Sequence, residues 1–85
     1  MTKFTYVITD EIGIHARPAG LLVKAAKGFG SKIMISANGK MADATRLMAL
    51  MGLGVKHGTE ITVEVKGDDE AAAAAAIEEF LKANL

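Results

Sequence analysis

The segment GIHARPA at residues 13–19 holds the side chains best suited to chemistry in this chain, an imidazole at His15 and a guanidinium at Arg17. Pro18 has no backbone N–H and fits the first turn of a helix, so the pattern predicts a helix that begins directly after His15. The free N–H groups of that turn, including those of Ala16 and Arg17, form an anion site beside the imidazole. The planar guanidinium of Arg17 adds a permanent charge that matches phosphate oxygens. The segment therefore predicts a site that stabilises a phosphorylated histidine without a metal ion.

The predicted position of His15 also affects its charge. The positive end of a helix disfavours a second positive charge, so we expect a neutral imidazole with one ring nitrogen free as a nucleophile. A phosphoryl group on an exposed histidine could be removed again by a large partner protein, which favours a relay of the group. A solvated histidine beside a helix start has the same local pattern, so these residues alone leave both interpretations open.

The composition excludes several other functions. The chain has 85 residues, which suits a single domain over 1–85, and ten basic residues balance ten acidic ones. Zero net charge and the absence of Trp argue against a nucleic-acid-binding surface. Without cysteine there is no disulfide, thiolate nucleophile or cysteine-bound zinc. No apolar run approaches the roughly 20 residues of a membrane span and no signal segment is recognisable, so we expect a cytoplasmic protein with no membrane insertion.

Hydrophobic periodicity predicts four strands and three helices. Alternation of apolar and polar residues predicts strands over 4–9, 33–37 and 61–66, with a short returning strand at 40–43. Helical spacing predicts helices over 16–27 and about 45–53, and a final helix that includes 71–81. Each strand has one apolar face, so the helices should cover one side of an antiparallel sheet. The expected fold class is α+β, in the order β-α-β-β-α-β-α.

Turn and capping residues mark several boundaries. Asn38 and Gly39 both tolerate positive φ, which predicts a two-residue hairpin turn. Thr45 is expected to cap the short helix, and the acidic residues 68–70 place negative charge at the positive end of the final helix. His57 has no acid or nucleophile beside it in sequence, so we expect it to be solvent-exposed, and we expect no metal site and no cofactor.

The segment at 13–19 resembles the active-site segment of HPr, the histidine-containing phosphocarrier family of the bacterial phosphoenolpyruvate-dependent sugar phosphotransferase system (PTS). The resemblance covers essentially the whole chain, including AKGF at 26–29, NGK at 38–40 and LG at 53–54. It implies an open-faced β-sandwich with four antiparallel strands and three helices on one face. It also implies that His15 is phosphorylated on Nδ1 and that Arg17 assists transfer. Enzyme I would be the donor and IIA domains the acceptors, so the chain would be a carrier and not an enzyme.

The apolar segment LMALMGL at 47–53 is expected to divide between core and surface, because a helix of about two turns cannot bury every side on a one-faced sheet. Exposed apolar patches mark partner sites, and methionine suits a surface that fits several partners. In HPr-like proteins the matching positions border the active histidine and contact enzyme I and IIA domains. The residues expected to contact partners are Gly20, Lys24, Lys27, Arg46, Leu47, Met48 and Met51.

Arg46 departs from the family, which usually carries a serine at this position. In many Gram-positive bacteria an ATP-dependent kinase phosphorylates that serine, and arginine cannot replace it, so we predict that this regulation is absent. Two alternatives remain open, an HPr-like carrier of a nitrogen-related phosphotransfer system and a non-carrier regulatory binding protein on the same fold. The second kind of protein lacks the active histidine and keeps the serine, which is the reverse of this chain. We expect a monomer.

Overall fold

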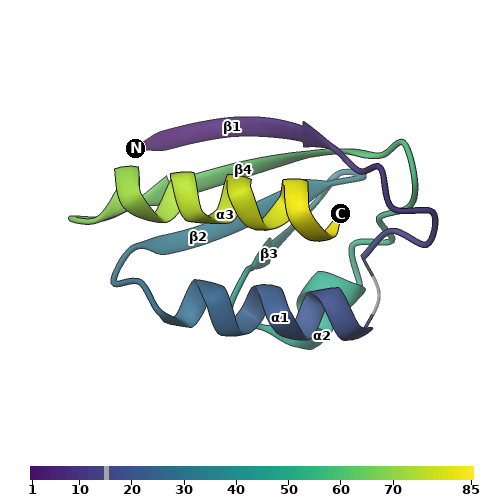
Figure 1. Cartoon of the computed structure of the whole chain (residues 1–85), viewed down its shortest axis with the longest axis horizontal. Helices are drawn as coiled ribbons and strands as arrows, with labels where there is room; N and C mark the ends of the chain where they lie inside the picture. Colours follow the sequence, from purple (N-terminus) through teal and green to yellow (C-terminus); the bar gives the residue numbers. More distant parts are fainter. Residues whose placement is uncertain (15) are drawn as a thin grey trace.

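The sheet and helices follow the predicted order in the computed structural model, which describes residues 1–14 and 16–85. His15 lies outside the described residues. The helices all lie on one face of the sheet, and its other face is open (Figure 1). The strands are β1 (Thr2–Val7), β2 (Lys32–Ala37), β3 (Lys40–Asp43) and β4 (Glu60–Lys66), and the helices are α1 (Ala16–Lys27), α2 (Leu47–Met51) and α3 (Glu70–Asn84).

The register of the sheet explains why one face is apolar. The strands lie in the order β1-β4-β2-β3 and every neighbouring pair is antiparallel. Phe4 pairs with Val63, Val63 with Ile35, and Ile35 with Ala42, so one apolar row crosses all four strands. Ile35 and Val63 are completely buried. Because side chains alternate along a strand, the same register leaves the polar neighbours on the open face, which confirms the predicted α+β class.

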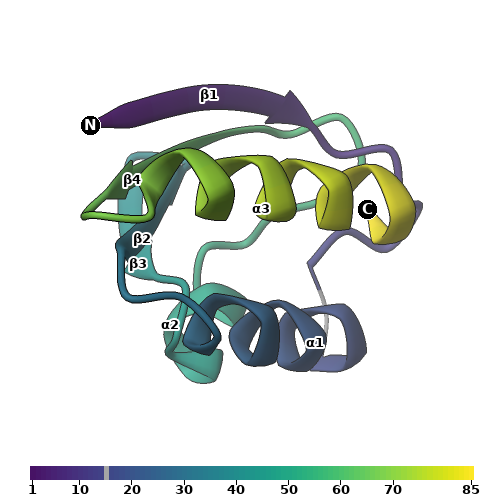
Figure 2. The same cartoon turned by 60° about the vertical axis from the view of Figure 1, so that its left-hand side comes forward.

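The helices cover the apolar face with the residues that their periodicity predicts. α1 buries Ala19, Leu22 and Ala26, and α3 buries Ile77 and Leu81. The two helices lie side by side, and α2 sits next to α1 at the β3 side of the sheet (Figure 2). Within residues 1–14 and 16–85, no helix has both the length and the apolar character needed to cross a membrane.

The hairpin between β2 and β3 has the predicted turn. Asn38 has φ 53° and Gly39 has φ 76°. Positive φ at both central residues is what a type I′ turn requires, and its twist matches that of the flanking strands. The turn therefore sets the pairing of Ala37 with Lys40.

The prediction that Thr45 caps the short helix is wrong. α2 spans only Leu47–Met51, and its N-cap is Arg46, which makes no side-chain capping bond. The Thr45 hydroxyl instead donates to Asp43 Oδ1 at 2.6 Å, and the Thr45 backbone N–H donates to the same oxygen at 2.9 Å. The carboxylate at the end of β3 competes for the hydroxyl, so Thr45 closes a turn before the helix.

Asp69 lies at the start of α3, but its carboxylate binds a different part of the chain. It is the N-cap of α3 but makes no side-chain capping bond. Its carboxylate accepts hydrogen bonds from the Gly30 and Ser31 backbone N–H groups, at 2.9 Å each, and from the Ser31 hydroxyl. These bonds join the connection between α1 and β2 to the start of α3. They lower the pKa of Asp69, the Ser31 hydroxyl most and the Gly30 N–H next.

We predict that the Asp69→Asn variant loses less stability in acid than the unmodified chain. A carboxyl whose pKa is lowered by folding stabilises the fold above its unfolded pKa, and that contribution disappears as the pH falls through its folded pKa. The loss should therefore begin near the ordinary pKa of 3.8 and continue as the pH falls below it. Urea unfolding between pH 2 and pH 7 measures the effect. The variant should be less stable at pH 7 and show a flatter acid limb, and equal slopes for both proteins would contradict the prediction.

Candidate functional site

The connection from β1 to α1, residues 8–14, is held at both ends by the segment that precedes β4. The Ile8 N–H donates to the Thr59 carbonyl at 3.0 Å, near the start of the connection. The Ile14 N–H donates to the Val55 carbonyl at 3.2 Å, one residue before His15. The segment 55–59 therefore fixes the backbone that leads to position 15, although the two segments are far apart in sequence.

The end of α3 holds the middle of the same connection. The main-chain oxygen of Leu85 accepts hydrogen bonds from the N–H groups of Thr9, at 2.6 Å, and Asp10, at 2.7 Å. Asp10 Oδ2 in turn accepts from the N–H groups of Ile12, at 3.0 Å, and Gly13, at 3.1 Å. Sequence reasoning left the place of Leu85 open, and the structure puts its main chain against this connection.

Gly13 lies where a side chain has no room. Its φ is 87°, and an added Cβ would overlap the Val55 carbonyl oxygen and lie 2.6 Å from the Lys56 Cα. Position 13 can therefore approach the Val55 backbone only as glycine.

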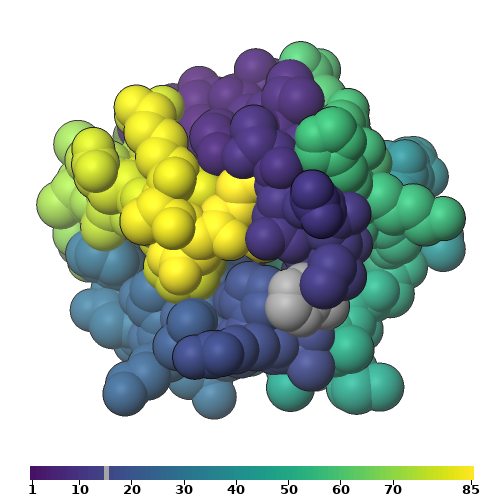
Figure 3. Space-filling view, turned by 45° about the vertical axis from the view of Figure 1, so that its right-hand side comes forward, coloured from purple at the N-terminus to yellow at the C-terminus, as the bar shows by residue number. Residues whose placement is uncertain are grey.

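The start of α1 has the features of an anion site. Ala16 and Arg17 are exposed, Pro18 and Ala19 are buried, and the first turn contains no acidic residue. The first-turn N–H groups have no intrahelical partner, so they can donate hydrogen bonds to an anion from solvent. Figure 3 shows this face, where residues 8–14, α1 and the end of α3 meet at the surface. His15, the predicted phosphorylation site, lies outside the described residues.

A shallow depression lies beside Arg17. It is lined by Arg17, Pro18, Leu21 and Asn84, so it joins the start of α1 to the end of α3. The Asn84 amide donates to the Phe80 carbonyl at 3.0 Å, which leaves its carbonyl oxygen as a further acceptor. The depression is open, and it leaves the Arg17 guanidinium accessible to a partner.

The predicted partner residues form an exposed surface on α1 and α2. Met48 is 79% exposed, and Leu47 and Met51 are each 39% exposed, whereas Leu50 of the same helix is completely buried. We call Leu47, Met48 and Met51 the α2 patch. α2 packs against α1, whose exposed Lys24 and Lys27 and half-buried Gly20 follow helical spacing, and Arg46 is exposed just before α2.

Sequence reasoning missed two exposed apolar residues near the site. Ile12, in the connection before α1, is 65% exposed, and Leu21, in α1, is 45% exposed. Leu21 falls outside the apolar stripe formed by Ala19, Leu22 and Ala26. This position was the sequence signal that could have predicted its exposure. Ile12 gave no such signal, because apolar residues in loops can be exposed or buried.

The ligand-type side chains of residues 1–14 and 16–85 do not gather into a metal site. His57 is exposed, as predicted. Among the described residues, no group of three or more histidine, aspartate or glutamate side chains could hold a metal ion.

A sequence model of the family described as PTS HPr component phosphorylation site matches residues 2–83. The chain belongs to the PTS HPr family. The phosphocarrier protein HPr of Mycoplasma capricolum is 44% identical to it over 81 residues, which are 95% of this chain and 91% of that protein. A solved histidine-containing phosphocarrier protein of Mycoplasma is 43% identical with a TM-score of 0.90, covering 93% of this chain and 90% of the other. An HPr structure from Thermoanaerobacter tengcongensis is 35% identical with a TM-score of 0.92, covering 98% and 93%.

Membership of the HPr family confirms the resemblance and the fold inferred from the sequence. The chain is a phosphocarrier of the PTS, a non-enzymatic component that carries a phosphohistidine. The family implies enzyme I and IIA domains as its partners.

Proposed function

We propose that His15 accepts a phosphoryl group on Nδ1 from enzyme I and passes it to IIA domains. Arg17 and the backbone N–H groups of Ala16 and Arg17 stabilise the transferred group. The observation that carries the proposal is the start of α1 at Ala16, directly after His15, with Arg17 exposed and no acidic residue in the first turn. Oriented N–H groups and a guanidinium stabilise charge on phosphoryl oxygens without a metal ion.

The step exchanges one bond for another. The Nδ1 lone pair of His15 forms a bond to phosphorus while the bond from phosphorus to enzyme I breaks, and the electron pair of that bond returns to enzyme I. The negative charge on the peripheral oxygens faces Arg17 and the first turn of α1. Donation to a IIA domain repeats the exchange with His15 as the leaving group.

The proposal is tested by intact mass spectrometry after incubation with phosphoenolpyruvate and enzyme I. We expect an acid-labile gain of one phosphoryl group that is absent from the His15→Ala variant and lost again when a IIA domain is added. No gain with an enzyme I that phosphorylates a known HPr would overturn the proposal.

We further propose that the α2 patch, together with Gly20, Lys24, Lys27 and Arg46, binds both partners. The exposure of Met48 beside basic residues supports this, since an apolar anchor in a basic surround suits acidic partner surfaces.

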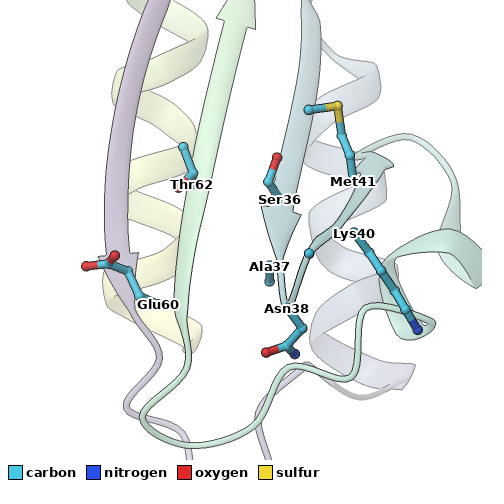
Figure 4. A pocket seen from close by; sticks show the side chains of 8 residues that line it. Ser36, Ala37, Asn38, Lys40, Met41, Glu60 and Thr62 are labelled. Carbon is cyan, nitrogen blue, oxygen red and sulfur yellow. The ribbon is translucent and has the colours of Figure 1, made fainter.

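Truncating Met48 should weaken docking without changing chemistry. For Met48→Ala we expect the KM for enzyme I to rise about 5- to 30-fold, the effect of losing about 1–2 kcal/mol at a contact anchor, with kcat nearly unchanged. Met41→Ala is the matched control, because Met41 is 58% exposed and stands on the open face of the sheet (Figure 4). Equal KM values for the two variants would contradict the assignment of the patch.

We propose that regulation by an ATP-dependent HPr kinase is absent. Arg46 occupies the position of the regulatory serine, and the neighbouring Thr45 hydroxyl is engaged by Asp43. We predict no mass gain when the chain is incubated with ATP and an HPr kinase that phosphorylates a serine-containing HPr in a parallel reaction. A phosphoryl group on Thr45 would contradict the prediction.

We also propose that the chain acts as a monomer in the cytoplasm. A single copy pairs all four strands and encloses its own apolar core, which supports independent folding. HPr proteins are typically cytoplasmic, which supports this location.

A further inference from the structure

The side chain of Asn38 reaches from the hairpin turn to the segment that follows α2. Its Nδ2 donates to the Leu53 carbonyl at 2.9 Å and to the Gly54 carbonyl at 3.2 Å. Lys40 Nζ, from the same hairpin, lies 3.4 Å from the Gly52 carbonyl oxygen. Figure 4 shows both side chains directed from the hairpin toward this segment. Asn38 therefore holds two successive carbonyl groups of residues 53–54 at once.

The next residue along that segment contacts the connection before α1. Val55 is buried, with 4% of its surface exposed, and its carbonyl accepts the Ile14 N–H at 3.2 Å. Gly13 packs directly on the backbone of the same residue. Hydrogen bonds and packed backbone thus run without a gap from Asn38, through residues 53–55, to the residue before His15.

We propose that Asn38 is a positioning residue for phosphoryl transfer, because its amide sets the Val55 carbonyl that fixes Ile14 and, through it, the approach to His15. The inference rests on the proposed function, in which His15 is the phosphorylated residue. Asn38 does not touch the phosphoryl group and acts only through residues 53–55.

The turn conformation alone does not account for an amide at this position. Glycine and aspartate also tolerate the φ of 53° at residue 38. Of the residues that suit the turn, asparagine supplies two N–H donors on one nitrogen, which is what the Leu53 and Gly54 carbonyls require. Aspartate at this position would place a carboxylate against two carbonyl oxygens.

The variants Asn38→Gly and Asn38→Asp separate positioning from turn formation, since both keep the turn and remove the donors. Ser31→Ala is the matched control, because it removes a side-chain hydrogen bond to Asp69 at the opposite end of the molecule. Two experiments are done on each protein. Hydrogen exchange gives the exchange rate of the Ile14 amide, and steady-state kinetics gives kcat and KM for phosphorylation by enzyme I.

We expect both Asn38 variants to lower kcat, roughly tenfold or more for Asn38→Asp, because small misplacements of reacting groups cost up to about a hundredfold in rate. KM should change little, since the α2 patch is untouched. The Ile14 amide should exchange faster in both variants and at the original rate in Ser31→Ala.

The inference is overturned if the Ile14 amide exchanges equally in all proteins, or if kcat falls no more in the Asn38 variants than in Ser31→Ala. Failure of the proposed function would look different, since the unmodified chain would then gain no phosphoryl group. In that event the Ile14 exchange rates alone decide whether Asn38 positions the connection.

Discussion

The Gly13→Ala variant is expected to lose most of its phosphoryl uptake together with a large part of its stability. The backbone of residue 13 has φ 87°, which strains an L-residue, and the new Cβ would overlap the Val55 carbonyl oxygen. Strained backbone and overpacking cost about 1–3 kcal/mol each, a large share of the roughly 5–15 kcal/mol that stabilises a typical domain. Relief requires the connection to move off Val55, which displaces Ile14 and the site that follows it.

A second glycine provides the control for this prediction. A Cβ on Gly67 would lie 2.5 Å from the Ser31 Oγ and 2.7 Å from the Ser31 Cα, at the end of the molecule away from α1's first turn. Gly67→Ala should therefore lose comparable stability in urea unfolding but keep the transfer rate of its folded fraction. Transfer by enzyme I is measured below the unfolding transition of both variants. Equal transfer rates for folded Gly13→Ala and Gly67→Ala would contradict the role of the Val55 contact.

The Arg17→Ala variant is expected to reduce the transfer rate about a hundredfold or more. Removal of one preorganised hydrogen-bond donor has an effect of this size in other group-transfer sites. Arg17 is exposed at the start of α1 and is the single cation of its first turn. The effect should fall on kcat more than on KM, because the guanidinium interacts with charge that develops on the transferred oxygens.

Two further variants test the chemistry of Arg17. Arg17→Lys keeps the charge but loses the bidentate fork, so its rate should lie between those of the unmodified chain and Arg17→Ala. Lys66→Ala removes an exposed charge at the end of β4 and should leave the rate unchanged. A time course of intact mass with enzyme I measures all of them. An unaltered rate in Arg17→Ala would remove Arg17 from the proposed site.

The elements with the strongest periodicity were predictable from sequence. Ile61, Val63 and Val65 alternate with polar residues, and all three are completely buried in β4. α1 spans the predicted residues 16–27 because its apolar stripe, its proline and the glycine after it all indicate the same helix. Such patterns are local, so they predict the element correctly when the rest of the chain provides one apolar surface for that element to pack against.

The Thr45 capping prediction and the hydrogen bonds of Asp69 show where local patterns do not determine a side chain's partner. Thr45 has a high preference for helix N-caps, yet its hydroxyl binds Asp43. Asp69 sits at a helix start, yet its carboxylate binds the Gly30 and Ser31 backbone, 39 and 38 residues away. Both side chains have several possible hydrogen-bond partners, and the partner that each one binds depends on the groups that folding brings near.

The sequence by itself predicted the fold class from its periodicity, and its resemblance to a known family gave the family and the residues proposed for the site. Only the tertiary structure decided how the site is held. The contact of Gly13 with Val55 and the bonds from Asn38 to residues 53–54 join segments that no periodicity relates. Their pairing follows from the way the sheet and helices pack, since backbone groups left in the connections must find partners wherever the packed elements bring them together.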